Sequence, residues 1–148
     1  MKVVIAEKPS VARDIAKVLK VKGAKEGFIE GNGYSITWAL GHLVTLSDPQ
    51  IYDKKFARWR MDALPIVPEE FMIEVQSNKG VKKQFGVIKK LLNNKQLTEV
   101  VCATDAGREG ELIFRYIYDL VGCKKPIKRL WISSQTDKAI KEGFDNLK

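Results

Sequence analysis

Three short apolar runs along the chain predict buried strands. They lie at residues 3–6, 99–103 and 129–132. The first two are rich in β-branched side chains and show no polar alternation, which is typical of strands covered on both faces, as in a parallel sheet. Their spacing leaves room for a helix after each strand, so the pattern indicates an α/β fold.

Four amphipathic stretches alternate with these runs and predict helices. They span about residues 10–19, 81–92, 108–121 and 137–147, and Thr136 is a suitable N-cap for the last one. In the third helix, the side chains expected to face the core are Leu112, Ile113, Tyr116, Ile117 and Leu120.

The pattern changes between the first two helices. Residues 28–30 and 34–40 flank the glycine-rich turn 31–33, which predicts a β-hairpin. Residues 41–70 are irregular and contain three prolines, so we expect a long loop insertion of the kind that often has a function. The chain therefore predicts one domain over residues 1–148: a central, mostly parallel sheet of about four strands with helices on both faces, plus the hairpin and the loop.

Composition adds a preference for a polyanionic partner. The chain has 26 Lys and Arg against 18 Asp and Glu, a net charge of +8, which suits nucleic acid and also simple solubility. Cys102 and Cys123 are the two cysteines and lack metal-site spacing, which is typical of a reducing cytoplasm. There is no apolar run of about 18 residues and no signal peptide pattern, so we expect a cytoplasmic protein without a membrane partner.

Acidic side chains gather where two of the predicted strands end. Glu7 ends the first strand, and Asp105 follows the run at 99–103 by two residues. If these strands are neighbours, about 4.8 Å apart, the two carboxylates converge on one sheet edge, where α/β proteins bind ligands. Glu109 lies in the first turn of the next helix and is expected to reach back over the same edge.

Carboxylates this close need a countercharge. A hard cation such as Mg²⁺ supplies it, with Mn²⁺ as a tolerated substitute, and Arg108 is placed to contact a phosphate bidentately. Gly107 and Gly110 would let such a phosphate approach the backbone. The acids also suit an ordinary helix start, where first-turn carboxylates are favourable. Neither nucleotide motif, G-x-x-x-x-G-K-[ST] nor G-x-G-x-x-G, occurs.

Other polar residues have two readings each. His42 is either a turn residue or a contact to a nucleic-acid backbone. Trp59 with Arg60 either anchors the long loop or binds single-stranded nucleic acid by stacking and phosphate contact. Ser133 and Ser134 either cap the last helix or contact a phosphate at the same edge as Glu7. The basic cluster Lys124, Lys125, Lys128 and Arg129 is expected to form a solvated face.

Together these motifs resemble a known family. The stretches VVIAEKPSVARDIAKVL and CATDAGREGELIFRYIY are similar to the Toprim domain of bacterial type IA DNA topoisomerases. WALGHLVTL, RWRMDALPIVPEEF and KRLWISSQT follow in the order found in the topoisomerase III branch, so the resemblance covers essentially the whole chain. It implies the Toprim, Rossmann-like fold.

The resemblance also implies a mechanism. In this family a tyrosine attacks single-stranded DNA, another strand passes through the break, and the break is resealed without ATP. By position Glu7 handles a proton at the 3′-oxygen, Lys8 stabilises the transition state, and Asp105 and Glu109 hold Mg²⁺ with Glu7. The family's tyrosine lies in a later domain beyond residue 148, so this stretch is expected to need the remaining domains of its polypeptide and not to cleave DNA alone.

Gly107 departs from the family pattern, which usually reads T-D-x-D-R-E-G-E. An aspartate is replaced here, so we hypothesise that Glu7 and Asp105 are the main ligands and that Glu109 acts through water. One charge fewer should weaken Mg²⁺ binding without DNA. Two alternatives stay open: a Toprim nuclease or primase-like enzyme, and a non-catalytic nucleic-acid-binding module whose metal site has decayed.

Overall fold

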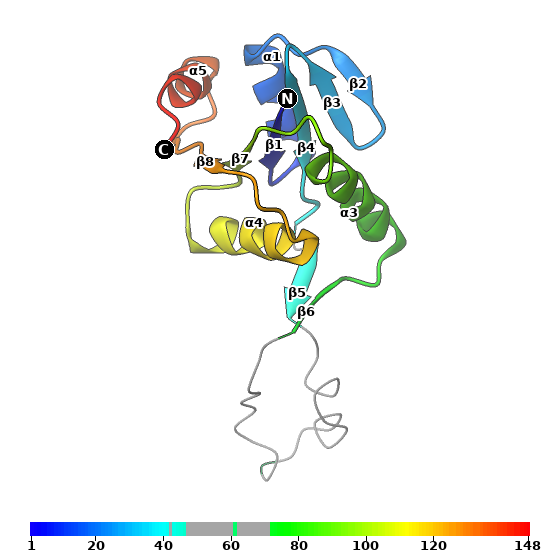
Figure 1. Ribbon diagram of the computed structural model, residues 1–148. Coiled ribbons are helices and arrows are strands. Elements are labelled where there is room, and N and C mark those ends of the chain that lie inside the picture. Colours follow the sequence, from blue (N-terminus) through cyan, green and yellow to red (C-terminus); the bar gives the residue numbers. More distant parts are fainter. Residues whose placement is uncertain (42, 47–60, 62–71) are drawn as a thin grey trace.

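The computed structural model describes residues 1–41, 43–46, 61 and 72–148. In these residues the strands are β1 (Lys2–Ala6), β2 (Gly23–Lys25), β3 (Phe28–Gly31), β4 (Tyr34–Trp38), β5 (Val44–Leu46), β6 (Ile73–Val75), β7 (Glu99–Ala103) and β8 (Ile127–Arg129). The helices are α1 (Pro9–Val18), α3 (Lys79–Leu92), α4 (Arg108–Val121) and α5 (Asp137–Asp145). Figure 1 shows their arrangement.

The central sheet has the strand order β2-β3-β4-β1-β7-β8. Strands β4, β1, β7 and β8 run parallel, and the β2–β3 hairpin continues the sheet in antiparallel pairing. This confirms the predicted α/β class with a mostly parallel sheet. A second, two-stranded sheet joins β5 to β6.

Helices cover both faces of the sheet, which explains why β1 is apolar throughout. Alternate side chains of a strand point to opposite faces. Helices α3 and α4 lie on one face of the sheet, and α1 and α5 lie on the other (Figure 1). Val3 and Ile5 pack with α3 and α4, whereas Val4 and Ala6 pack with α1 and α5. All four of these side chains are fully buried.

The predicted hairpin is confirmed, because β3 and β4 pair in antiparallel fashion on either side of the turn. Strand β4 also pairs in parallel with β1, which makes it an inner strand of the sheet. Two other sequence predictions about the elements need correction. Strand β5 lies inside 41–70, where no strand was expected. The last strand covers Ile127–Arg129 instead of 129–132. Leu130 and Ile132 are apolar because they pack beside α1 and α5, not because they continue the strand.

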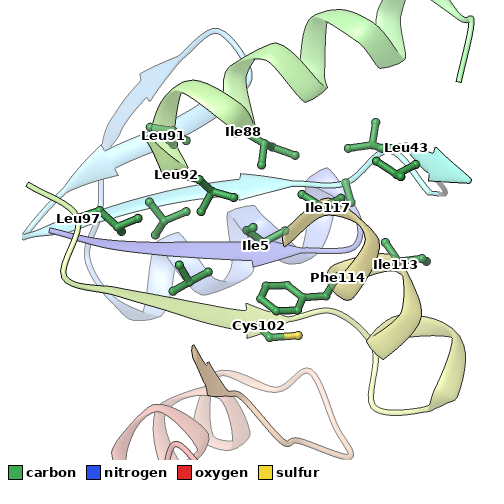
Figure 2. Packing of buried hydrophobic residues seen from close by; sticks show 14 residues of the cluster. Ile5, Leu43, Ile88, Leu91, Leu92, Leu97, Cys102, Ile113, Phe114 and Ile117 are labelled. Atoms are coloured by element: carbon green, nitrogen blue, oxygen red, sulfur yellow. The ribbon is translucent and has the colours of Figure 1, made fainter. Parts of the chain in front are cut away.

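Helix α4 turns a slightly different face inward than its pattern predicted. Phe114 is fully buried, and Figure 2 shows its ring between α4 and the sheet, beside Ile5 and Cys102. Leu112, which was expected to face the core, is 41% exposed. Ile113 and Ile117 are buried as predicted. The inward stripe therefore runs along positions 110, 113, 114 and 117, which is regular helical spacing.

Candidate metal and nucleic-acid site

The parallel pairing of β1 and β7 brings two acids together at the carboxyl edge of the sheet. Ala6 lies opposite Ala103 in the register, so Glu7 leaves the edge where the segment leading to Asp105 leaves it. Glu7 is half-buried and Asp105 is exposed. The convergence expected from the sequence is therefore present.

The environment of Glu7 penalises its charged form. Burial is the largest cause that raises the pKa of Glu7, and the neighbouring Asp105 side chain raises it further. The Asp105 backbone N–H and the nearby positive charge of Lys8 act in the opposite direction. The net effect is a pKa above the ordinary value, so this edge attracts either a proton or a cation.

We expect glutamine at position 7 to stabilise the metal-free protein at neutral pH. The pKa of Glu7 in the folded protein is above the ordinary value of 4.5. The protonated side chain therefore favours the folded state at pH values below 4.5, and this stabilisation is lost as the pH rises through the raised pKa. Glu7→Gln should therefore raise the free energy of unfolding by about 0.3–1 kcal/mol at pH 7, and by almost nothing near pH 4. Urea unfolding in EDTA at both pH values measures this difference.

The matched control for this prediction is Glu142→Gln on α5. Glu142 forms an ion pair with Lys138 at 3.9 Å, so its charge is favourable and its loss should not stabilise the protein at pH 7. A Glu7→Gln protein that is less stable than the parent at pH 7 would show that the Glu7 charge carries no penalty.

The remaining predicted ligand, Glu109, lies in the first turn of α4 and is exposed. Among the described residues, no three Asp, Glu, His or Cys side chains come close enough to form a metal site by themselves. The structure thus brings Glu7 and Asp105 together without completing a triad. Arg108 begins α4 and Lys8 precedes α1, and both are exposed at this edge.

Arg129 is a site residue that the sequence did not reveal. Its side chain is only 13% exposed, so the expectation of a solvated cluster is wrong for this residue. Nη1 donates to Thr104 Oγ1 at 3.0 Å and Cys102 Sγ at 2.6 Å, and Nη2 donates to the backbone oxygen of Asp105 at 2.9 Å. Nε lies 3.8 Å from a carboxylate oxygen of Glu111. The guanidinium therefore fixes the main chain that carries Asp105.

The β7–α4 loop is also closed on itself. Thr104 Oγ1 donates to the backbone oxygen of Gly110 at 2.8 Å. A Cβ added to Gly110 would lie 2.1 Å from the Asp105 backbone oxygen, so this glycine is required by close packing within the protein and not by an approaching phosphate. A Cβ on Gly107 would meet nothing within 4 Å. Of the two glycines in the acidic motif, Gly107 is therefore the one that has space for a side chain.

Three predicted nucleic-acid contacts, His42, Trp59 and Arg60, lie outside the described residues. They stay predictions. In the described parts of the chain, no helix is long and apolar enough to cross a membrane.

A family model and similar sequences indicate the same family. The Toprim domain model matches residues 2–135. The chain is 58% identical over 146 residues to DNA topoisomerase 3 of Bacillus anthracis and 56% identical over 146 residues to DNA topoisomerase 3 of Bacillus subtilis (strain 168). Each alignment covers 99% of this chain and 20% of the relative, so the chain spans about one fifth of the length of these proteins.

A solved structure has the same fold. Full-length topoisomerase I from Thermotoga maritima matches with a TM-score of 0.60 and 23% sequence identity, over 99% of this chain and 21% of that one. The family model covers the strands, the helices up to the start of α5 and both acids of the site. The chain therefore belongs to the Toprim domain family.

Proposed function

We propose that the chain is the Mg²⁺-binding Toprim part of a type IA DNA topoisomerase of the topoisomerase III kind, which cleaves, passes and reseals single DNA strands. The convergence of Glu7 and Asp105 at the carboxyl edge carries this proposal. The similarity to two proteins named DNA topoisomerase 3 supports it. The net charge of +8 suits single-stranded DNA as the partner.

The residues at the edge fit a hard divalent cation. Two carboxylates share the edge, and burial together with the proximity of Asp105 raises the pKa of Glu7. A cation between the two carboxylates would therefore reduce the free-energy cost of holding Glu7 in its charged form. Mg²⁺ prefers one or two carboxylates together with waters and phosphate oxygens. Glu7 and Asp105 would hold it directly and Glu109 through water. The ion, when bound, would neutralise charge on the phosphate that reacts.

The neighbouring side chains have roles that follow from their charge. Glu7 lies at the edge where the reacting phosphate would sit, and its carboxylate is suited to accept and return a proton at the 3′-oxygen of the broken strand. Lys8 follows Glu7 directly. The attraction between a cation and a phosphate that is being transferred is strongest in the transition state, so Lys8 is suited to stabilise that state. Arg108, at the start of α4, would bind a phosphate of the same strand.

Cleavage would need more than this stretch. In our proposal the nucleophilic tyrosine belongs to other domains of the same polypeptide, and the 148-residue chain alone does not cleave DNA. We also place the protein on DNA in the bacterial cytoplasm, in keeping with its named relatives.

A Mn²⁺ titration followed by NMR line broadening tests the proposal. We expect broadening centred on Glu7 and Asp105, and Asp105→Asn should weaken Mn²⁺ binding at least about tenfold. Gly107→Asp should strengthen binding roughly tenfold, because it adds a carboxylate where its Cβ has open space.

Asp119→Asn is the control, since it makes the same chemical change near the other end of α4. Tight binding that survives Asp105→Asn would refute the metal site. Broadening that needs a short single-stranded DNA would mean that a phosphate supplies a ligand. Salt-sensitive DNA binding without any localised broadening would favour a binding module instead, and metal-dependent nicking by the chain alone would favour a nuclease.

A further inference from the structure

A cleft of about 410 Å³ opens beside Asp105, between the β7–α4 loop and the segment that follows β8. Its floor is apolar and includes Val11, Ala103 and Leu130, all of them buried. Its rim carries the exposed residues Trp131 and those at 133–135. The volume is within the range of small-ligand sites, which are mostly apolar with a few polar groups that fix orientation.

Trp131 is the most unusual residue of this cleft. It is 57% exposed, although tryptophan is costly to leave in water. The Arg129 guanidinium lies 5.7 Å from the centre of its ring, and that guanidinium is itself fixed by hydrogen bonds to the β7–α4 loop. The indole is therefore an exposed ring beside a fixed cation, which is the arrangement that proteins use to stack nucleobases.

The polar groups of the rim suit a neutral nucleobase better than a charged group. Ser133, Ser134 and Gln135 are neutral donors and acceptors. Ser134 Oγ already accepts from the Thr136 N–H at 3.4 Å, which leaves its own O–H to donate. Among the described residues that line the cleft, Asp105 is the one with a charged side chain. Neutral hydrogen-bonding groups over an apolar floor match the edges and face of a base.

We infer that this cleft is a nucleotide subsite, in which Trp131 stacks on a base of the strand whose phosphate lies at Glu7 and Asp105. The inference rests on the proposed function, because Asp105 belongs both to the acidic pair and to the cleft. A strand bound at the acidic edge thereby has an adjoining place for one of its bases. The occupant to which we commit is single-stranded DNA, and a segment from another domain is the competing occupant.

NMR of the 148-residue chain with an eight-nucleotide single-stranded DNA tests the inference in EDTA, where no metal contributes. We expect shifts at the Trp131 indole N–H and at the amides of residues 133–135. Trp131→Ala should weaken DNA binding by about 5- to 100-fold, the effect of losing one base–aromatic stack. The slope of log affinity against log salt should not change, because no phosphate contact is removed.

Two variants separate stacking from general damage. Trp131→Phe keeps an aromatic face and should bind within about threefold of the parent. Leu112→Ala removes an exposed apolar side chain that does not line the cleft and should bind normally. Thermal unfolding of each variant checks that the fold is retained.

Unchanged DNA affinity in Trp131→Ala, or no shift at the Trp131 indole at millimolar DNA, would overturn the inference and leave another domain as the occupant of the cleft. A Mn²⁺ titration of the same sample keeps the proposed function separate. If Mn²⁺ still broadens the NMR signals of Glu7 and Asp105 while DNA causes no shifts in the cleft, the subsite is refuted and the metal site is retained. If DNA shifts the signals of the cleft while Mn²⁺ causes no localised broadening, the subsite is retained and the metal proposal is refuted.

Discussion

Gly110→Ala is expected to destabilise the protein by about 2 kcal/mol and to displace the loop that carries Asp105. The added Cβ would lie 2.1 Å from the Asp105 backbone oxygen and 3.0 Å from its backbone carbon and nitrogen. Main-chain atoms cannot rotate away as a side chain does, so the cost should reach the upper part of the roughly 1–3 kcal/mol range for overpacking. The better helix propensity of alanine returns only about 1 kcal/mol.

This displacement should also be visible at the metal site. If Asp105 moves, Mn²⁺ affinity should fall by about 10- to 100-fold, as it does when the support of a ligand is removed. Urea unfolding and a Mn²⁺ titration of the same variant measure both effects. Gly86→Ala is the matched control: Gly86 lies inside α3, its added Cβ meets nothing within 4 Å, and the change should stabilise the protein by about 0.5–1 kcal/mol. Equal stability changes in the two variants would contradict the close contact.

The convergence of the two acids was predictable because it depends on strands alone. Short apolar runs with no polar alternation mark buried parallel strands, and parallel strands end at a common edge. Glu7 and Asp105 each follow such a run closely, so their meeting needs only that β1 and β7 be neighbours, which they are. The four helices were predictable for the same reason, since each one buries a single apolar stripe.

The supports of the site were not predictable, because they depend on contacts between distant residues. Nothing in the local pattern distinguishes Arg129 from the lysines before it, yet the fold places its side chain under the β7–α4 loop. Gly110 reads as an ordinary glycine in a helix start until the Asp105 carbonyl is found against it. Leu130 and Trp131 look like one more strand, although only Leu130 is buried. Local periodicity predicts elements, whereas these features arise from packing between elements.

Arg129→Met is expected to cost about 1–3 kcal/mol of stability. Methionine has a similar length and no charge, and it would leave Thr104 Oγ1 and the Asp105 backbone oxygen without the donors that now reach them at 3.0 and 2.9 Å. Thr104 is the buried one of these two residues, and a buried polar group that loses a partner costs about 1–3 kcal/mol. Lys128→Met is the control, because it removes the same charge from an exposed position on the same strand and should change stability by no more than about 0.5 kcal/mol.

The metal affinity of the Arg129 variants separates two roles of this residue. If Arg129 acted only through its positive charge, Arg129→Met would strengthen cation binding at the acidic edge, because it removes a repelling charge. Since the guanidinium holds the Asp105 main chain, we expect the opposite: about 10-fold weaker Mn²⁺ binding in Arg129→Met. Arg129→Lys keeps the charge but lacks the planar fork that reaches several acceptors, so it should also bind Mn²⁺ more weakly than the parent. Tighter Mn²⁺ binding by Arg129→Met at full folding would refute the positioning role and leave only the electrostatic one.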